Sequence, residues 1–178
     1  MDRGEVVVVT GFGAFREFLV NPSWTAAQGL KSVGLGEWTV YVKELPLAVH
    51  LGVARGSGVI ILEQSGKNCH YRDKDVCGFC PESHCCVQGG PDQLDSVIDM
   101  RAVARRFQRA GVDVVYSRDA GGYLCDFAYY LSLYHGQRRA ALIHVPSGGG
   151  PASAHRLVPL LQSIIQTALC QLDSSQTA

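Results

Sequence analysis

Glu5-Val6-Val7-Val8-Val9-Thr10 is a short, continuous run of β-branched residues at the beginning of the chain. Such a run is typical of a strand that is buried on both faces, as in a parallel sheet covered by helices. Gly11-Phe12-Gly13 ends the run, and Asn21-Pro22-Ser23 predicts a turn into a helix over 23–31. The first segment is therefore predicted to be a strand followed by a helix.

The same alternation of strands and helices continues along the chain. Further apolar runs predict strands over 38–45, 59–62, 112–116 and 140–145. Further helices are predicted over 96–110, 123–135 and 153–171. Asp95 is placed to cap the first of these helices, and Gly111 and Gly136 stand where helix-ending glycines belong. Residues 64–92 are polar and rich in Cys and Gly, which indicates one long loop. The pattern predicts an α/β fold with a mainly parallel sheet between two helix layers.

Length and charge limit the classes of function. The chain has 178 residues, of which 47% are hydrophobic, and this is enough for the core of a single domain over 1–172 with a frayed tail over 173–178. The 16 basic and 16 acidic residues cancel, which argues against a nucleic-acid partner. No run of about 18 apolar residues is present, so no membrane partner is expected. Without a signal peptide, the expected location is the cytoplasm.

The seven cysteines are an odd number and are unevenly spread, five of them lying between Cys69 and Cys86. This distribution does not suggest a disulfide scaffold, and ordinary reduced thiols are the favoured interpretation. A zinc site is the alternative, with Cys77 and Cys80 as one half of the ligand set. The residues that could complete it are His84, Cys85 and Cys86. The adjacent pair fits poorly, because two neighbouring thiolates rarely bind one ion.

Three ionisable residues follow or end predicted strands, where α/β proteins place their active sites. Glu63 follows one strand, Cys125 begins a helix after the next, and His144 ends another. A cysteine in a first helical turn is favoured as thiolate, a histidine can take its proton, and a carboxylate can orient the histidine. Each residue also has an ordinary alternative: a small core cysteine, a satisfied core histidine and a solvated glutamate.

Several motifs in order resemble the pyroglutamyl-peptidase I family, cytosolic cysteine peptidases that remove N-terminal pyroglutamate. The motifs span about residues 5–170. They are Val-Thr-Gly-Phe-Gly-Ala-Phe (9–15), Asn21-Pro22-Ser23-Trp24, Leu62-Glu63 with Asn68, Cys77-Gly-Phe-Cys-Pro with Cys85-Cys86, Asp95-Ser-Val-Ile-Asp-Met, Asp-Ala-Gly-Gly-Tyr-Leu-Cys-Asp-Phe (119–127) and His144-Val145-Pro146.

The resemblance implies a role for each matching residue. Cys125 corresponds to the nucleophile, His144 to the general base and Glu63 to the third member of the triad. Phe12 and Phe15 correspond to the aromatic residues that hold the pyrrolidone ring. The resemblance also implies an enzyme that needs no metal or other cofactor and acts on peptides with N-terminal pyroglutamate. Arg72 lies in a stretch that could supply a second oxyanion donor, beside the backbone N–H of Cys125.

The chain departs from the family pattern at two places. Arg16 stands where family members usually have glycine, and a crossover helix is nearly absent between Pro46 and Gly52. A parallel crossover needs about a dozen residues, so either the 38–45 strand pairs differently or the 47–53 segment forms a strand without a covering helix. Two hypotheses follow: an active cysteine exopeptidase, or a weak or inactive relative with a binding or regulatory role because of the deletion near residues 46–52.

Overall fold

The computed structural model describes residues 6–12, 28–29, 31–33, 39–45, 47–54, 56–75, 77–146 and 151–174. The chain divides into two compact units, Met1–Pro46 and Leu47–Ala178. No helix among the described residues is long and apolar enough to cross a membrane.

The first unit contains a two-stranded parallel sheet. Strand β1 (Val6–Phe12) pairs with β2 (Thr39–Leu45), in register from Val6 opposite Thr39 to Phe12 opposite Leu45. The strands predicted over 5–10 and 38–45 are therefore confirmed. Residues 28–29 and 31–33 are helical, at the end of the helix predicted over 23–31, whose other residues lie outside the described part.

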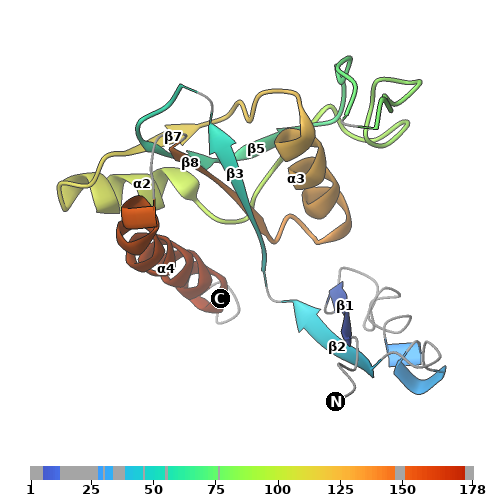
Figure 1. The fold of residues 1–178 in the computed structure, drawn as a ribbon, viewed down its shortest axis with the longest axis horizontal. Coiled ribbons are helices and arrows are strands. Elements are labelled where there is room, and N and C mark those ends of the chain that lie inside the picture. Colours follow the sequence, from blue (N-terminus) through green and yellow to red (C-terminus); the bar gives the residue numbers. More distant parts are fainter. Residues whose placement is uncertain are drawn as a thin grey trace. The chain divides into compact units, whose positions relative to one another are not determined.

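The second unit is built on a four-stranded sheet in the order β3-β8-β4-β7 (Figure 1). Its strands are β3 (Ala48–Ala54), β4 (Ile60–Glu63), β7 (Val114–Ser117) and β8 (Ala140–Pro146). The β3–β8 and β4–β7 pairs are parallel, and only β4 and β8 run antiparallel. The mainly parallel sheet and three of its strands are as predicted from the apolar runs.

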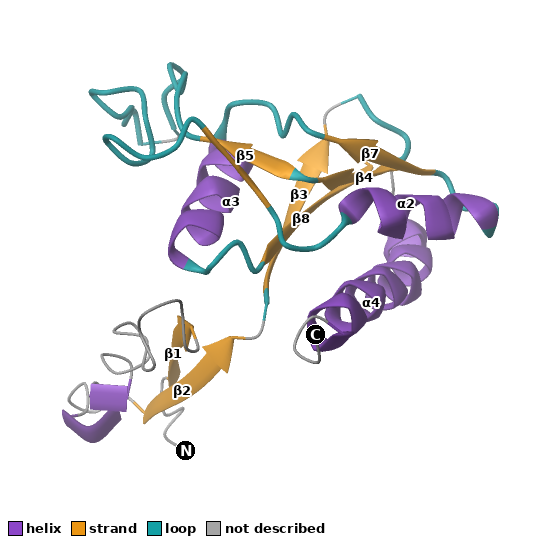
Figure 2. Cartoon of the chain, turned by 180° about the vertical axis from the view of Figure 1, so that it is seen from behind, coloured by secondary structure: helices purple, strands orange, loops and turns teal. Residues whose placement is uncertain are grey.

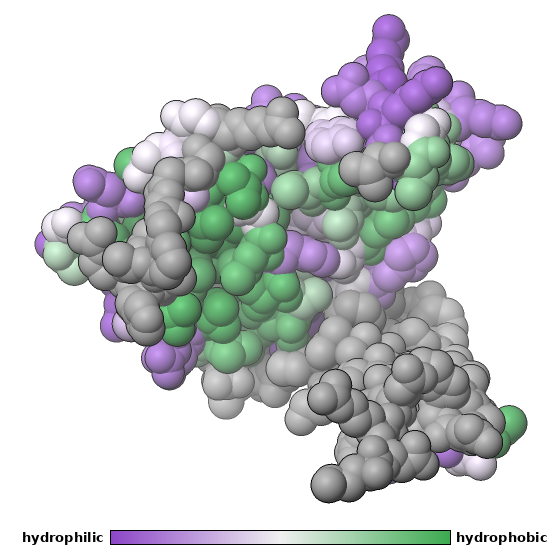
Figure 3. All heavy atoms as spheres, in the orientation of Figure 1, coloured by the Kyte–Doolittle hydropathy of each residue, from purple (hydrophilic) through white to green (hydrophobic). Residues whose placement is uncertain are grey.

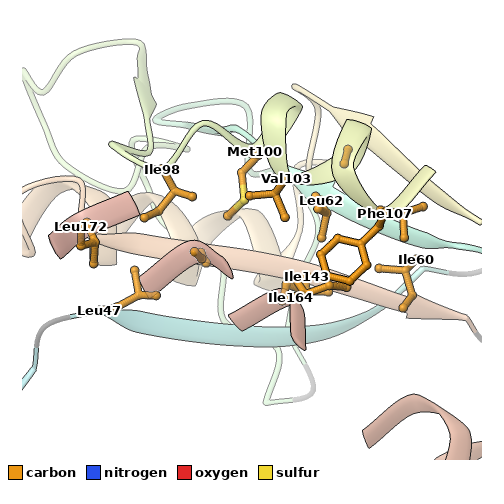
Figure 4. Packing of buried hydrophobic residues seen from close by; sticks show 14 residues of the cluster. Leu47, Ile60, Leu62, Ile98, Met100, Val103, Phe107, Ile143, Ile164 and Leu172 are labelled. Carbon is orange, nitrogen blue, oxygen red and sulfur yellow. The ribbon is translucent and has the colours of Figure 1, made fainter. Parts of the chain in front are cut away.

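Helices cover both faces of this sheet (Figure 2). Alternate residues of β8 point to opposite faces, so Ala141 and Ile143 pack with α2 (Met100–Arg109) and α4 (Pro151–Ser174). Figure 4 shows this larger core, to which Leu62, Phe107 and Ile164 contribute. Ala140 and Leu142 pack on the other side with α3 (Leu124–His135). The three-layer α/β/α arrangement is thus confirmed in this unit.

Two local predictions were wrong. Asp95 does not cap a helix: it ends the short strand β6 (Gln93–Asp95), and its carboxylate accepts hydrogen bonds from Ser65 and Arg118. Helix α2 begins five residues later, where the Asp99 side chain accepts the backbone N–H of Ala102. The 64–92 segment is also not one unbroken loop, since β5 (Ser65–Lys67) pairs antiparallel with β6.

The cysteine prediction also needs correction. Cys69 and Cys85 form a disulfide between segments that also pair as an isolated antiparallel bridge. The other five cysteines, Cys125 among them, form no disulfide. Sequence spacing did not reveal this pair, because the backbone pairing that aligns the two cysteines is not visible in the cysteine pattern.

The structure defines the segment between β2 and β3, where the family's crossover helix is missing. Only Pro46 and Leu47 separate β2 from β3, and no helix lies between the two strands. On the α4 side of β3, Val49 packs against the core, whereas Leu51 and Val53 remain 56% and 58% exposed. Figure 3 shows apolar surface over β3 and α4, where Val158 is also exposed. The structure therefore agrees with the second of the two alternatives given for this segment: residues 48–54 form a strand, and no crossover helix covers it.

Candidate active site

Cys125 is the second residue of α3 and is partly buried. Gly121 and Gly122 lead into the helix with φ of 104° and 100°, a backbone conformation that favours glycine. Asp119 holds this turn by accepting the N–H of Gly121 and the ammonium of Lys67, whose hydrogen bond lowers the pKa of Asp119. The N-cap residue Tyr123 makes no side-chain capping bond, so the first N–H groups of α3 are not used by a cap.

His144 and Glu63 form a buried pair on the α3 side of the sheet. Nδ1 of His144 lies 3.0 Å from Oε1 of Glu63, and the residues are only 7% and 2% exposed. The antiparallel register explains this contact. Glu63 stands opposite Leu142 and therefore lies diagonally from His144, two residues further along the same face of β8.

The second carboxylate oxygen of Glu63, Oε2, is buried without a hydrogen-bond partner among the described residues. With Nδ1 of His144 donating to Glu63, the other ring nitrogen, Nε2, is left to accept a proton. A buried carboxylate in this position also stabilises the imidazolium that forms when His144 takes up that proton.

Gly52 brings the thiol and the imidazole to one small gap. A Cβ atom at position 52 would lie 2.8 Å from Cys125 Sγ and only 3.1 Å from His144 Nε2. The same atom would lie 2.8 Å from His144 Cδ2. Gly52 stands opposite His144 in the β3–β8 register and is buried, so no other side chain fits at this position without displacing the thiol or the imidazole.

Asp126, next to Cys125, is a second buried acid in this region. It is fully buried, and its Oδ1 accepts the backbone N–H of Lys67 at 3.0 Å. Burial raises the pKa of Asp126, against the smaller opposing effect of the Lys67 hydrogen bond. The carboxylate thus ties the first turn of α3 to β5 rather than pairing with His144.

The three candidate catalytic residues therefore come from three elements that surround one place: Glu63 from β4, Cys125 from α3 and His144 from β8. The two candidate ring-binding residues are Phe12 and Phe15. Phe12 ends β1 in the first unit, and Phe15 lies outside the described residues, as does Arg16. Arg72 is exposed in the segment after β5.

Gly52 is the site residue that the sequence argument missed. The available signal was a glycine inside the apolar strand between Leu51 and Val53, since an interior strand glycine often marks a close approach of another group.

The alternative metal site was built on Cys77, Cys80 and their neighbours. Cys80 Sγ lies 3.6 Å from His84 Nδ1, and both atoms also lie within hydrogen-bonding reach of the Tyr71 carbonyl. Cys85 is held in its disulfide with Cys69. Within the described part of the chain, no group of three or more Cys, His, Asp or Glu side chains is arranged to hold a metal ion.

Comparison with known proteins identifies the family of this chain. The sequence model of the pyroglutamyl peptidase family matches residues 45–149. Pyroglutamyl-peptidase 1 of Rattus norvegicus is 43% identical over 195 residues, covering 97% of this chain and 93% of the relative. Pyroglutamyl-peptidase 1-like protein of Homo sapiens is 54% identical over 125 residues, covering 69% of this chain and 63% of the relative. A mutant pyrrolidone carboxyl peptidase from Pyrococcus furiosus matches in structure with a TM-score of 0.62 and 25% identity, over 94% of this chain and 99% of that one.

Proposed function

Because this chain belongs to the pyroglutamyl peptidase family, we propose that it is a cysteine exopeptidase that releases pyroglutamate from peptide N-termini. The observation that carries this proposal is the shared gap at Gly52, which Cys125 Sγ and His144 Nε2 both border. A thiol and an imidazole nitrogen that border the same gap can serve as the nucleophile and base that acyl transfer requires.

The reaction begins with transfer of the Cys125 thiol proton to His144 Nε2. The thiolate then attacks the carbonyl carbon of pyroglutamate, and the resulting tetrahedral intermediate collapses as His144 returns the proton to the leaving amine. A water molecule, deprotonated by the same Nε2, hydrolyses the pyroglutamyl thioester and restores the thiol. Glu63 keeps the imidazole oriented through Nδ1 and stabilises its charged form in both halves of the reaction.

The oxyanion of the tetrahedral intermediate is assigned to the first turn of α3. The backbone N–H of Cys125 has no intrahelical acceptor, because the first four N–H groups of a helix point beyond its end. The positive end of the helix dipole adds to this stabilisation. Arg72 stays a candidate for the second donor.

The pyrrolidone ring is flat and uncharged, so an aromatic slot suits it better than a charged pocket. We assign Phe12 and Phe15 to this slot by the family resemblance. Arg16 follows them where the family usually has glycine, and it is expected to narrow the slot. No cofactor enters this mechanism, and peptides in the cytoplasm are its expected substrates.

The alternative function is that of a weak or inactive relative with a binding or regulatory role. The observation in its favour is the two-residue link between β2 and β3, together with the exposed Leu51 and Val53 on the strand that carries Gly52. A scaffold changed so close to the catalytic gap can preserve the triad without preserving the substrate pocket.

Turnover of a pyroglutamyl amide by the purified, reduced protein distinguishes the active peptidase from the weak or inactive relative. We expect thiol-dependent release of the amine, lost in Cys125→Ala and unchanged in Cys77→Ala, which removes a free exposed cysteine outside the triad. Turnover no higher than that of Cys125→Ala, from protein with a cooperative thermal transition, would favour the inactive relative.

A further inference from the structure

We propose that two copies of this chain exchange their β1–β2 sheets, so that the β1 strand of each copy extends the four-stranded sheet of the other at β3. The exchange is inferred from strand pairing and chain connectivity alone. Its consequence for the active site, that each catalytic centre is completed by the partner, rests on the proposed function.

The first observation is the edge of the sheet at β3. Among the described residues β3 pairs only with β8, so its other edge carries backbone N–H and C=O groups without a strand partner. This edge strand is seven residues long and exposes Leu51 and Val53. A long apolar edge of this kind is a template for another strand.

The second observation is the small sheet of the first unit. A pair of strands alone is marginally stable in water, and three or more are needed to hold an apolar face. Strand β1 carries the continuous run Val6–Val9, the pattern of a strand buried on both faces, whereas β2 alternates apolar residues with Thr39, Tyr41 and Lys43, as a strand with one exposed face does. Among the described residues β1 pairs only with β2, so a further strand beside β1 would stabilise this small apolar sheet.

The third observation is the link between the two sheets. For β1 to lie parallel beside β3 of its own chain, the chain would have to return from the end of β2 to the beginning of β3 along the whole length of a strand. A seven-residue strand is about 23 Å long. The three Cα–Cα steps from Leu45 through Pro46 and Leu47 to Ala48 reach at most about 11 Å. A parallel β1–β3 pair is therefore impossible within one chain, whereas no such return is needed when β1 comes from a second copy. Shortened hinges are a known cause of exchange between protomers.

The exchange has a direct consequence for the catalytic centre. In a parallel pair the carboxyl ends of both strands lie at the same edge, so the partner's Phe12, at the end of its β1, would stand beside the end of β3. Gly52 lies near that end and borders Cys125 Sγ. The ring-binding residues assigned above would therefore act on the catalytic triad of the other copy.

The oligomeric state tests the exchange without reference to activity. Sedimentation velocity at micromolar concentration should find the full chain as a dimer. Insertion of 14 Gly and Ser residues between Pro46 and Leu47 should convert it to a monomer, because the chain can then make the return by itself. The same insertion between Gln88 and Gly89, at an exposed turn, should leave the dimer intact. A monomeric full chain, or a dimer that survives the longer link, would overturn the exchange.

Complementation tests the shared active site. Cys125→Ala and Phe12→Ala should each have little activity, and an equimolar mixture refolded together should recover roughly a quarter of the wild-type rate, since half of the dimers are mixed and each has one intact site. No recovery, when the wild type is an active dimer, would overturn the shared site. A wild-type dimer without any turnover would instead contradict the proposed function and leave the exchange supported.

Discussion

Gly52 and His144 stand opposite each other on neighbouring parallel strands, and the missing side chain at Gly52 leaves a space that both His144 Nε2 and Cys125 Sγ border. Gly52 lies on β3, the strand that follows the shortened link, and so connects that link to the candidate catalytic pair. We therefore expect a single methyl group at this position to impair catalysis, although Gly52 takes no part in the proposed chemistry.

Gly52→Ala should lower kcat/KM on the order of 100-fold, because a methyl group 2.8 Å from both Cys125 Sγ and the imidazole must displace one of them. The loss should fall mainly on kcat, and the rate of alkylation of Cys125 by iodoacetamide should change its dependence on pH. Steady-state kinetics and peptide mapping of the alkylated protein measure both effects.

Two other glycines provide matched controls. A Cβ at Gly58 meets nothing within 4 Å, so Gly58→Ala should keep wild-type activity and stability. At Gly66 a Cβ would lie 3.0 Å from the backbone of Tyr130, so Gly66→Ala should destabilise the fold by about 1–3 kcal/mol without changing the alkylation profile of Cys125. If Gly52→Ala behaves like either control, its proposed effect on the catalytic pair is wrong.

Glu63→Gln should lower kcat on the order of 1000-fold, because an amide can present its NH2 to His144 Nδ1 and so favour the wrong tautomer. Glu63→Asp should restore part of the rate, since it keeps the carboxylate. Glu82→Gln, at an exposed position, serves as the control for loss of one negative charge. Full activity in Glu63→Gln would remove Glu63 from the mechanism.

Asp126 should make stability depend on pH in the direction opposite to a salt-bridged acid. Burial raises its pKa in the folded state above the ordinary 3.8, so the ionised group destabilises the fold at neutral pH. This destabilisation is relieved as the pH falls through the raised pKa and is gone below the unfolded value. Asp126→Asn, whose side-chain oxygen can still accept the Lys67 N–H, should raise Tm most at pH 7 and progressively less toward pH 4. A Tm difference that grows toward low pH would contradict this sign.

The Cys69–Cys85 disulfide should stabilise the segment that precedes β6. Its two cysteines are 16 residues apart, and closing a loop of about that length stabilises a fold by roughly 3 kcal/mol. Peptide mapping without reduction should find this pair joined, and the variant with serine at both positions should have a lower Tm. Cys77→Ser is the control, and an equal Tm for the double variant and the wild type would count against the pairing.

Local sequence patterns predicted most elements of the fold because apolar runs and helix-ending glycines act over a few residues. Gly136 ends α3, and Gly111 follows the end of α2 with a positive φ, as expected. The Asp95 prediction failed because the hydrogen bonds that hold it come from distant residues, Ser65 and Arg118. Pairing across the chain decides such cases, and a single sequence does not display it.

The geometry of the candidate triad also depends on strand pairing that a single sequence does not display. The prediction placed Glu63 and His144 at strand ends that share one edge of the sheet, but β4 and β8 are antiparallel. The two residues meet through the diagonal register on one face, which no local pattern encodes. The motifs that resemble the family singled out Glu63, Cys125 and His144, which the structure brings to one place, while the role proposed for Gly52 emerged only from the geometry.

Covalent trapping at the nucleophile is the most direct test of the central claim, that Cys125 of this shortened chain attacks a pyroglutamyl carbonyl. The reduced protein is treated with a pyroglutamyl chloromethyl ketone, digested and mapped by mass spectrometry. We predict modification of Cys125 alone among the seven cysteines, lost in His144→Ala and prevented by excess pyroglutamyl peptide. Equal labelling of Cys77 and Cys125, or labelling that excess substrate does not slow, would contradict the account.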